Sequence, residues 1–361
     1  MKDLECWLFL ARAPLVGAAT AKKMLEYFGE PQTIIKSSMR EKKRSNLFKP
    51  VTLEYFEKLD DSIIAADLEL LQQKNVNIIH LGHANYPKLL TEIFDPPIVL
   101  FTRGNLELLK LPQISIVGSR NPDLAGKKIS FSFAKSLSNR GLTITSGMAT
   151  GIDTQAHQGA LSGKSSTIAV FGTGIDRIYP VKNQKLAHEI AEKGLIISEF
   201  GANTKPKPQN FPRRNRIVSG LSLGTLVVQA NIRSGSLITS RTAMEQGREV
   251  FAIPGSIQNP LSQGCHHLIK QGAKLVENVN DIFNELSGMV AYVKQNASSK
   301  VKTPDNTEAN PLLEHIGYEP TPLDQLPAIS GLAMNQINSD LVYLELEGKV
   351  EMLPGAKVQR I

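Results

Sequence analysis

The sequence predicts an α/β protein built on a parallel sheet that helices cover on both faces. Short runs of β-branched and apolar residues alternate with segments of helical periodicity through residues 76–290, and such alternation is typical of parallel sheets. Hydrophobic residues make up 41% of the chain and charged residues 21%, which is enough apolar material for a full core. The length of 361 residues predicts two or three domains.

The apolar runs predict seven strands in this central region: Ile114–Gly118, Leu142–Ser146, Thr167–Gly172, Leu195–Glu199, Thr225–Gln229, Val250–Ile253 and Lys274–Val276. A helix is expected over Ala125–Asn139, because apolar residues recur there at helical spacing. Gly141 would end it, since glycine is common just past a helix C-terminus. In such sheets the ligand site lies beyond the carboxyl ends of the strands, at a topological switch point.

Both ends of the chain differ from this central region. Residues 1–75 have helical spacing, and Gly29-Glu30-Pro31 ends a helix that includes Met24 and Phe28. Residues 36–49 are basic and contain one acid, Glu41. Residues 291–307 are polar and aperiodic, which predicts a linker. Residues 308–361 would then form a small module.

Cysteine content and hydropathy restrict the compartment. The chain has two cysteines, Cys6 and Cys265, which excludes a disulfide scaffold and fits a reducing compartment. No apolar run approaches the roughly 20 residues that span a bilayer. Asp3, Glu5 and Arg12 interrupt the apolar start and disfavour a signal peptide. We therefore expect a cytoplasmic protein without a membrane partner.

The net charge of +7 is unevenly distributed along the chain. Residues 201–248 hold eight lysines and arginines against one acid, Glu245, whereas residues 308–361 hold eight acids against three bases. The first segment is thus net +7 and the second net −5. This segregation predicts a polyanion partner at the middle of the chain, with a solvated basic face as the alternative.

Small and hydroxylated residues follow four of the expected strands. The segments are Gly118-Ser119-Arg120, Ser146-Gly147-Met148, Gly172-Thr173-Gly174 and Arg233-Ser234-Gly235-Ser236. Such residues let an oxyanion approach the backbone, where free N–H groups at helix starts bind it. Four such loops at one sheet edge predict a phosphate-binding pocket.

Motifs for cofactor, metal or catalytic chemistry are weak. Neither G-x-G-x-x-G after the first strand nor G-x-x-x-x-G-K-[ST] occurs. Gly264-Cys265-His266-His267 reads as a loop entering a helix rather than a metal site. Asp153 and His157 could be an acid–base pair, but capping of a helix Thr154–Leu161 by Asp153, with His157 fixing the same turn, is favoured. We expect no catalytic residue, cofactor or metal.

Several segments of the central region follow one another in a characteristic order: Tyr86-Pro-Lys-Leu-Leu, Asp95-Pro-Pro-Ile-Val-Leu, Ile116-Val-Gly-Ser-Arg120, Ser146-Gly-Met-Ala-Thr-Gly-Ile-Asp153, Ile168-Ala-Val-Phe-Gly-Thr-Gly174, Tyr179-Pro180, Phe211-Pro-Arg-Arg-Asn-Arg-Ile217, Ser234-Gly-Ser-Leu-Ile-Thr239 and Gln246-Gly-Arg-Glu-Val-Phe-Ala-Ile-Pro-Gly255. This series resembles the DprA/Smf family of bacterial DNA-processing proteins. The resemblance implies an extended Rossmann-like domain that binds single-stranded DNA. It also implies protection of incoming strands in natural transformation, loading of the RecA recombinase onto them, a homodimer, and no enzymatic activity.

The resemblance also implies site residues. It places a phosphate pocket at Gly118, Ser119, Arg120, Ser146, Gly147, Gly235 and Ser236, and a basic lip at Lys207, Phe211, Arg213, Arg214 and Asn215. The dimer interface would lie near Leu261, Leu268 and Ile269. Two positions depart from the family pattern, which usually has arginine where Thr150 stands and glutamate where Gln229 stands. Thr150 puts one DNA contact in doubt, and Gln229 removes a charge from the pocket edge, which favours a phosphate there.

The chain ends resemble small modules. Pro14-Leu-Val-Gly17 with the helix after it resembles a helix-hairpin-helix or SAM-like module, which would touch DNA backbone non-specifically. Residues 308–361 resemble a winged helix, with Leu341–Lys349 as its recognition segment and a hairpin at Met352–Ile361. Because Asp340, Glu345 and Glu347 lie on that segment, we expect a protein-contact or regulatory module rather than a DNA reader.

Two other functions are weighed against single-strand binding. A Rossmann-like nucleotide glycosidase or phosphoribohydrolase of the lysine-decarboxylase-like type also has glycine-rich loops at its strand ends. It would need further glycines before Gly224-Thr225 and an acid where Gln229 stands, and both are missing. A transcription regulator reading duplex DNA with the tail is opposed by the tail's negative charge.

Overall fold

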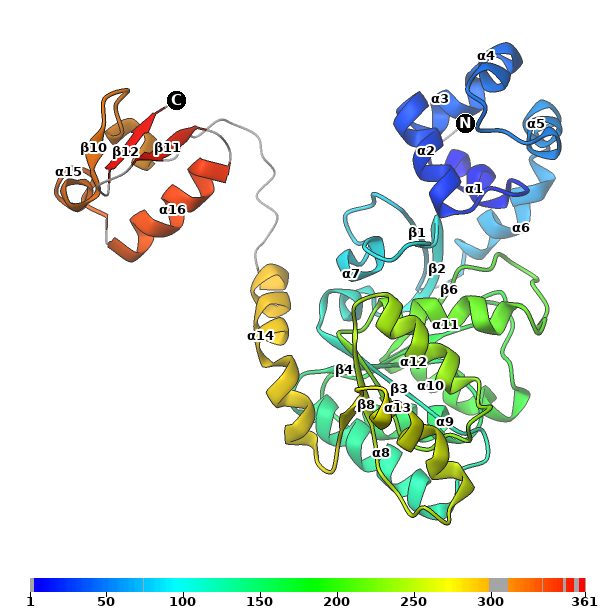
Figure 1. Ribbon diagram of the computed structural model, residues 1–361. Helices are drawn as coiled ribbons and strands as arrows, with labels where there is room; N and C mark the ends of the chain where they lie inside the picture. Colours follow the sequence, from blue (N-terminus) through cyan, green and yellow to red (C-terminus); the bar gives the residue numbers. More distant parts are fainter. Residues whose placement is uncertain are drawn as a thin grey trace. The chain divides into compact units, whose positions relative to one another are not determined.

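The computed structural model describes residues 3–73, 75–298, 311–332, 334–346, 349–353 and 357–360. The chain divides into two compact units, residues 1–298 and 299–361. The larger unit carries the central sheet together with the N-terminal helices (Figure 1). The smaller unit is a separate module, as the sequence predicts.

A nine-stranded sheet forms the centre of the larger unit, in the order β1-β2-β6-β5-β4-β3-β7-β8-β9. Its strands are β1 Val76–His80, β2 Val99–Gly104, β3 Gln113–Val117, β4 Thr143–Ser146, β5 Thr167–Val170, β6 Leu195–Ser198, β7 Gly224–Val227, β8 Glu249–Ala252 and β9 Lys274–Leu275. The seven expected strands are confirmed to within two residues at each end. They pair in parallel, and β3 to β7 are buried throughout, as strands covered on both faces must be.

Two strands were not expected from the sequence. β1 pairs with β2 and β2 pairs with β6, and both pairings are antiparallel. The sheet is therefore mixed: the predicted parallel sheet forms its body, and these two strands add an antiparallel edge that the sequence did not predict. Antiparallel neighbours need no crossover helix, and the connection between β1 and β2 contains only the four-residue helix α7 Lys88–Thr91. The alternation that revealed the other strands is therefore missing here.

The strand order reverses beside β3. The chain builds β3, β4, β5 and β6 outward in one direction, and then returns to place β7 on the other side of β3. The carboxyl ends of β3 and β7 therefore diverge into loops with a crevice between them. This is the predicted location of a ligand site.

Helices cover both faces of the parallel strands (Figure 1). On one face lie α8 Leu124–Asn139, α9 Ile152–Leu161 and α14 Val279–Ser298, whose apolar side chains share one core with β3, β4, β7 and β8. On the other face lie α7 Lys88–Thr91, α11 Asn210–Gly220, α12 Ser236–Glu245 and α13 Gln263–Lys270. The helix α10 Gln184–Lys193 packs with the N-terminal helices and β6. Short 3-10 turns occur at Leu106–Lys110, Val181–Asn183 and Pro260–Ser262.

Six helices form the N-terminal region: α1 Asp3–Arg12, α2 Ala18–Phe28, α3 Pro31–Lys36, α4 Met39–Arg44, α5 Pro50–Glu57 and α6 Ser62–Leu70. The helix α2 ends where expected, because Gly29 takes a φ of 85° and donates its N–H to the Leu25 carbonyl. Buried Phe9, Met24 and Ile34 share one core with β1 and α10. The helical region is thus packed onto the sheet domain.

The predicted linker begins too early. The helix α14 continues to Ser298, so residues 291–298 are helical, and the rest of the linker lies outside the described residues. The smaller unit contains 3-10 turns at Pro311–His315 and Leu323–Gln325, the helices α15 Leu326–Ser330 and α16 Met334–Leu346, and the strands β10 Thr321–Pro322, β11 Val350–Leu353 and β12 Lys357–Arg360.

The smaller unit has its own core and sheet. Leu312, Leu326, Leu341 and Val358 are among its buried residues, and its strands pair in the order β10-β12-β11. The antiparallel pair β11–β12 is the expected hairpin, although residues 354–356 and 361 lie outside the described residues. Helices followed by a small antiparallel sheet agree with the predicted winged helix.

Candidate functional site

A cavity of about 780 Å³ opens at the carboxyl ends of β3 and β7. Residues from the loops after β3, β4 and β7 and from α11 and α12 line it, together with Tyr179: Val117, Gly118, Ser119, Arg120, Asn121, Gly147, Ala149, Asp153, Tyr179, Pro208, Phe211, Pro212, Arg214, Asn215, Val218, Asn231, Arg233, Ser234, Gly235, Ser236, Ile238 and Thr239. The cavity therefore lies at the reversal of strand order, where the sequence places it. Nine of the twelve residues expected in the pocket and lip line it.

Three arginines and one acid are among the lining residues, so the cavity is electropositive. Arg120 and Arg233 are exposed, and no ion pair with either occurs among the described residues. Their guanidinium groups are thus available to an anionic ligand. Arginine suits phosphate, because its fork of donors matches two phosphate oxygens.

Arg214 lies at the base of the cavity and is 5% exposed. Its guanidinium donates to the Gly147 carbonyl, to the Val170 carbonyl at 2.6 Å and to Asn215 Oδ1 at 3.0 Å. Burial lowers the pKa of Arg214 to about 10, and the Asp153 carboxylate acts against that shift. The side chain therefore remains charged near neutral pH and is fixed in place by the ends of β4 and β5.

An aromatic ring lies near two of these arginines. The guanidinium carbons of Arg120 and Arg214 each lie 6.0 Å from the centroid of the Phe211 ring. The ring of Tyr179 lies 5.6 Å from the Phe211 ring, tilted by 41°, and Tyr179 is 46% exposed. Aromatic faces next to cations are what stacked nucleobases and their phosphates require.

The backbone N–H groups after β4 are already bonded. Asp153 Oδ2 accepts from Gly147 N at 3.0 Å and from Ala149 N at 3.2 Å. A carboxylate of the chain thus occupies the position that we expected a phosphate to take. Burial raises the pKa of Asp153, and the nearby Arg214 charge opposes that effect.

The predicted helix-capping role of Asp153 is wrong in its detail. The helix α9 begins at Ile152 after Gly151, so Asp153 lies inside the first turn and organises the loop before the helix. His157 does not fix that turn either. Its Nδ1 lies 2.7 Å from Thr167 Oγ1 on β5, while Thr167 donates to the Ile144 carbonyl. His157 therefore donates from Nδ1 and ties α9 to the sheet.

The loop after β3 is also largely bonded within the chain. Ser119 N donates to the Gln229 carbonyl at 2.6 Å, and Ser119 Oγ accepts from Asn121 N. The loop after β7 is also bonded within the chain where α12 begins, since Ser236 N donates to Ser234 Oγ at 3.3 Å and Leu237 N donates to the Ser234 carbonyl at 3.1 Å. No heavy atom lies within 4 Å of a Cβ built on Gly235, so this loop is open. An incoming anion would thus meet the start of α12 and three arginines rather than a ring of free N–H groups.

Three expected site residues do not line the cavity. Ser146 is fully buried and donates to the Ile116 carbonyl at 2.7 Å, so it is structural. Arg213 lies 3.3 Å from Glu199 in an ion pair, and Lys207 is exposed outside the cavity. The expected loop Gly172–Gly174 is also outside it, because the Phe211 ring packs against Gly172.

The two departures from the family pattern lie outside the cavity lining. Thr150 donates to the Arg120 carbonyl at 3.3 Å. The buried amide of Gln229 accepts from Asp123 N at 3.2 Å and fills the space beside Gly126. Gln229 therefore holds the start of α8, and its predicted effect on a phosphate in the pocket is wrong.

Leu268 cannot form the predicted dimer interface. It is 2% exposed in the single chain and belongs to the core beneath α13. Leu261 and Ile269 are half-buried. The family resemblance suggested this interface, but in the single chain Leu268 lies on the core-facing side of α13.

The helical hairpin also differs from the expectation. The first N–H of α2, on Ala18, donates to Asp95 Oδ1 at 3.3 Å, and Asp95 Oδ2 accepts from Arg216 Nε at 3.2 Å. Glu199 binds the other two nitrogens of Arg216 at 2.9 and 2.8 Å. The helix end that would touch a DNA phosphate therefore holds an internal carboxylate.

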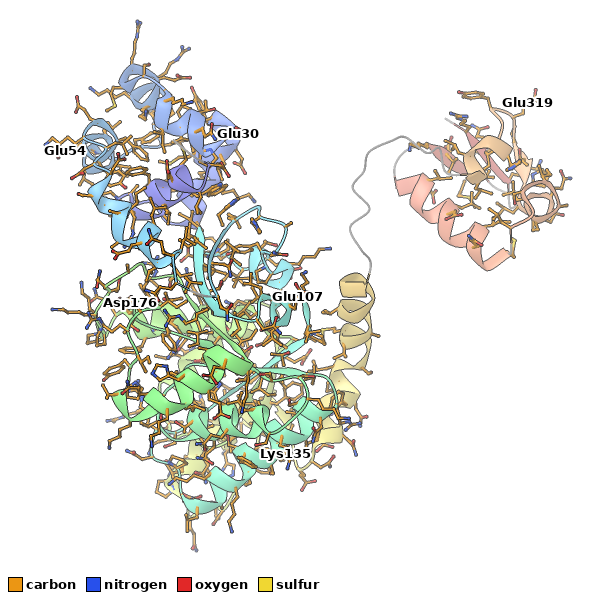
Figure 2. All side chains as sticks on the ribbon, turned by 180° about the vertical axis from the view of Figure 1, so that it is seen from behind. Glu30, Glu54, Glu107, Lys135, Asp176 and Glu319 are labelled. Atoms are coloured by element: carbon orange, nitrogen blue, oxygen red, sulfur yellow. The ribbon has the colours of Figure 1, made fainter. Side chains whose placement is uncertain are left out.

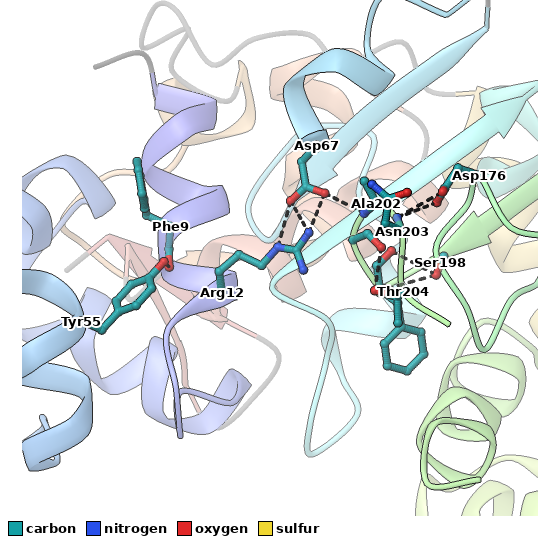
Figure 3. Close-up of polar contacts among 11 residues, drawn as sticks. Phe9, Arg12, Tyr55, Asp67, Asp176, Ser198, Ala202, Asn203 and Thr204 are labelled. Carbon is teal, nitrogen blue, oxygen red and sulfur yellow. Dashed lines mark hydrogen bonds and ion pairs between the residues drawn. The ribbon is translucent and has the colours of Figure 1, made fainter. Parts of the chain in front are cut away.

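A second carboxylate fixes the segment that precedes α11 (Figure 3). Asp67, fully buried on α6, accepts from Arg12 Nε at 2.8 Å, from Arg12 Nη2 at 2.6 Å and from Ala202 N at 2.7 Å. On the other side of the segment, both oxygens of Asp176 accept from Asn203 N at 3.1 Å. The N-terminal helices thus position the chain that leads into Phe211 and Arg214.

The sequence did not identify several lining residues. Tyr179, Ile238 and Thr239 were noted only within quoted motifs, and Asn231 was not noted. Tyr179 follows β5 by nine residues, and this distance hides its return to the cavity. Asn231 lies two residues before Arg233, and Ile238 and Thr239 follow Ser236. The quoted loop Arg233-Ser234-Gly235-Ser236 was therefore the available signal for all three.

Two further kinds of feature, clusters of metal-ligating side chains and membrane-spanning helices, are not found in the described part of the chain. No group of three or more His, Cys, Asp or Glu side chains gathers there as metal ligands. His266 lies in α13, with Nε2 at 3.0 Å from the Gly255 carbonyl. Across the same residues, no helix has both the length and the hydropathy to cross a bilayer.

Two family models match the chain. Residues 77–287 match the one described as DNA recombination-mediator protein A, and residues 296–356 match the DprA winged helix domain. Protein Smf of Escherichia coli is 42% identical over 301 residues, which make up 82% of this chain and 80% of that protein. DNA processing protein DprA of Streptococcus pneumoniae is 50% identical over 200 residues, 55% of this chain and 71% of that one.

Two solved structures are similar in fold. The X-ray structure of DNA processing protein A from Streptococcus pneumoniae covers 79% of this chain and 99% of its own, with a TM-score of 0.70 and 39% identity. A structure from Helicobacter pylori, described as giving insights into the unique single-stranded DNA binding mode of DNA processing protein A, covers 59% and 96%. Its TM-score is 0.54 and its identity 31%.

Proposed function

We propose that this chain, which belongs to the DprA/Smf family of DNA-processing proteins, binds single-stranded DNA without strong sequence preference. The observation that carries the proposal is the cavity at the ends of β3 and β7, where the guanidinium groups of Arg120 and Arg214 both lie near the Phe211 ring. The Helicobacter pylori relative is described by its single-stranded DNA binding. The family's members are DNA-processing proteins and are not known as enzymes.

The cavity suits a nucleotide unit of a single strand. A backbone phosphate would lie between the exposed guanidinium groups of Arg120 and Arg233, near the start of α12. A base would stack on the Phe211 and Tyr179 rings, and stacking tolerates any base because each has a π-face. Paired bases of a duplex are buried in their own stack and cannot enter a concave site without being flipped out.

Anisotropy titrations with a labelled single strand and the matched duplex test this function. We expect tighter binding to the single strand, little change between sequences of equal length, and an affinity that falls steeply with salt because counterions are released. Equal or tighter binding to the duplex would contradict the proposal. A mononucleotide added as competitor shows whether one unit suffices.

We further propose that bound strands are handed to the RecA recombinase during natural transformation. The description of the matching family model as a recombination mediator supports this role. RecA-dependent ATP hydrolysis should start sooner on a strand that is covered by a single-strand binding protein when this chain is added. An unchanged delay would exclude loading, while leaving DNA binding itself intact.

We also propose that the chain acts as a homodimer. Because Leu268 is in the core, we place the dimer interface at the edge of the sheet that β9 forms, where Leu275 is 41% exposed. Edge strands offer unpaired backbone groups and pair readily. Sedimentation of the Leu275→Glu variant should show a monomer, whereas persistent dimers would place the interface elsewhere.

A further inference from the structure

Five exposed cations gather on the N-terminal helices, outside the cavity. They are Lys36 at the end of α3, Arg40, Lys43 and Arg44 on α4, and Lys49 before α5, and we refer to them as the α4 cation cluster. In Figure 1, α4 lies at the end of the helical region that points away from the sheet. The cluster is thus a second basic surface of the larger unit.

The charge of this surface is segregated and uncompensated. Residues 1–75 contain twelve lysines and arginines and eleven acids, but residues 36–49 hold six of those cations and a single acid, Glu41. None of the ion pairs found among the described residues involves a member of the cluster. A helical region of nearly balanced charge therefore presents one strongly positive face.

The sixth cation, Lys42, explains how the cluster is held. Lys42 is 1% exposed, and its Nζ donates to the Ile35 carbonyl at 3.0 Å and to the Ser37 carbonyl. The same nitrogen lies 5.9 Å from the centroid of the Phe56 ring. Lys42 thereby fastens α4 to the end of α3 and to α5, so the exposed cations project from a fixed turn.

The surroundings of the cluster favour a nucleic-acid backbone over a protein partner. Protein interfaces are organised around a buried apolar core, and no large hydrophobic side chain of residues 36–49 is exposed. Tyr27 is 51% exposed and touches the Phe28 ring, which in turn contacts the ring of Phe48, next to Lys49. Tyr27 is thus an exposed ring of the same helical region, and such rings stack with the bases of a single strand.

We propose that the α4 cation cluster is a second binding site for the backbone of single-stranded DNA, one that a strand seated in the cavity reaches when it is long enough. The inference rests on the proposed function, because it extends the path of the same strand. It also places the DNA contact of the N-terminal helices at the cluster instead of at the N-terminus of α2, which already binds the Asp95 carboxylate. Each phosphate held by the cluster adds to the number of counterions released.

Two triple variants with the same charge change test the proposal. Arg40→Gln, Lys43→Gln and Arg44→Gln remove three cluster charges, and Lys128→Gln, Lys135→Gln and Lys164→Gln remove three exposed charges elsewhere. Lys135 lies at the end of the unit away from Glu30 and Glu54 of the helical region (Figure 2). Since all six side chains are exposed, both variants should melt like the wild type.

Anisotropy titrations use two oligonucleotides, a short one of about 8 nucleotides and a long one of about 60. The short one is about the length that a single binding site covers, and the long one exceeds it. The cluster variant should bind the long strand about tenfold more weakly and lower its salt slope by about 2, for three lost phosphate contacts. Its affinity for the short strand, and both affinities of the control variant, should stay within about twofold of the wild type.

Two results would overturn the proposal: a cluster variant that binds the long strand like the wild type, or equal losses in both triple variants. The first would point to an acidic protein as the occupant of this surface. Failure of the proposed function would be seen in a different measurement: the wild-type chain would not bind the short strand. The comparison of the two triple variants on the long strand still decides on the cluster in that case.

Discussion

Arg120 and Arg214 border the same aromatic ring but are held in different ways. Arg214 is fixed by the carbonyls of Gly147 and Val170, whereas Arg120 is exposed and its guanidinium extends over Phe211. Arg214 therefore shapes the base of the cavity, and Arg120 is available to a ligand. Substitutions at the two positions should separate folding from binding.

Arg120→Ala should weaken single-strand binding by roughly 1.5–3 kcal/mol, the scale of a lost charge-assisted hydrogen bond. Its thermal stability should not change, because the side chain is exposed and has no ion pair among the described residues. Anisotropy and a melting curve measure the two effects, with Arg241→Ala as the matched control on exposed α12 surface. A loss of stability together with binding would make Arg120 structural.

Gly147→Ala should displace Arg214. An added Cβ would lie 2.6 Å from Nη2 and from the guanidinium carbon of Arg214, closer than van der Waals contact allows. We expect a destabilisation of about 1–3 kcal/mol from overpacking and weaker DNA binding. Urea unfolding and anisotropy measure both, with Gly288→Ala as control, since nothing lies within 4 Å of its Cβ. Unchanged binding would mean that the position of Arg214 does not matter.

His157 should make the protein sensitive to acid. Burial lowers its pKa from 6.5 to about 3, so the folded chain keeps it neutral while the unfolded chain takes up a proton. Stability is therefore fully present above about pH 6.5 and falls by up to about 1.4 kcal/mol per pH unit below it. Urea unfolding between pH 7 and pH 5 should show a shallower pH dependence for His157→Asn than for the wild type.

The exposed His188 provides the control for that experiment. His188→Asn should keep the pH dependence of the wild type. Since the slope and not the absolute stability is compared, a general loss of stability in His157→Asn does not obscure the result. Parallel slopes in all three proteins would show that His157 titrates normally in the folded chain.

Individual residues were predictable where chain position alone determines their place. Gly118 and Arg120 follow the strand β3 closely, so both reach the cavity. Phe211 and Asn215, which lie on α11, were indicated only by the resemblance to the DprA/Smf family. The inward side chain of Ser146 was not predictable, because at a strand end the pleat decides between the cavity and the interior. The bonds of Asp153 to Gly147 and Ala149 follow from loop geometry that no residue pattern encodes.

The helices of the N-terminal region act on the cavity through one segment. Residues 201–209 lead into α11 and are held by Asp67 through Ala202 and by Asp176 through Asn203. A space next to Gly201 is filled by the Arg12 guanidinium. These contacts join α1 and α6 to the element that carries Phe211 and Arg214.

Asp67→Ala should lower the free energy of unfolding by about 2–4 kcal/mol. It removes the buried partner of Arg12, whose side chain is 28% exposed, and leaves the N–H of Ala202 without its acceptor. Urea unfolding measures the effect. The control is Asp61→Ala, because Asp61 is exposed just before α6 and its side chain does not cap that helix. This variant should change the free energy of unfolding little. Equal effects of both variants would show that the buried pair adds no stability.

Elements were predicted best where they alternate. Each strand from β3 to β9 is followed or preceded by a helix, and a fully buried apolar run stands out between amphipathic segments. β1 and β2 form a hairpin-like edge joined by a long connection with the four-residue helix α7, so that contrast is missing. The start of α9 at Ile152 depends on Gly151, whose φ of 84° is a property of the tertiary loop.

In the whole chain, opposite charges lie in different units. The larger unit contains the basic residues 201–248, and residues 308–361 are net −5. In the smaller unit Leu341 and Leu344 of α16 face the core and Glu345 is exposed, whereas Glu347 lies outside the described residues. The winged helix is confirmed, and its proposed role as a protein-contact or regulatory module follows from charge.

Removal of residues 299–361 should leave single-strand affinity within about threefold, which is under 1 kcal/mol. An acidic module is repelled by phosphate, so at low salt its removal should tighten binding, where screening is weakest. Anisotropy at two salt concentrations measures this, with the cut placed after Ser298 because α14 continues to that residue. A loss above tenfold in a folded truncated chain would show that the smaller unit contacts DNA.

The separation of a tail module from the rest was predictable from composition and periodicity. The boundary predicted near residue 75 does not separate two compact units, because the N-terminal helices share one core with β1 and α10. The boundary near residue 291 was not predictable, because residues 291–298 are polar and yet continue a helix whose buried face is set earlier, by Ile282, Leu286 and Val290. Helices extended from a packed segment need little apolar character of their own. Polarity alone therefore placed the linker too early.

The carboxylates of Asp95 and Asp153 affect which anions the chain can bind. Both lie where a loose anion would otherwise bind, one at the first N–H of α2 and one in the loop after β4. A tethered group competes at an effective concentration that dissolved metabolites seldom reach. These two places are thus closed to inorganic phosphate, nucleotides and organic acids, and on the proposed function a polymer that offers many phosphates and bases at once has the advantage over small anions.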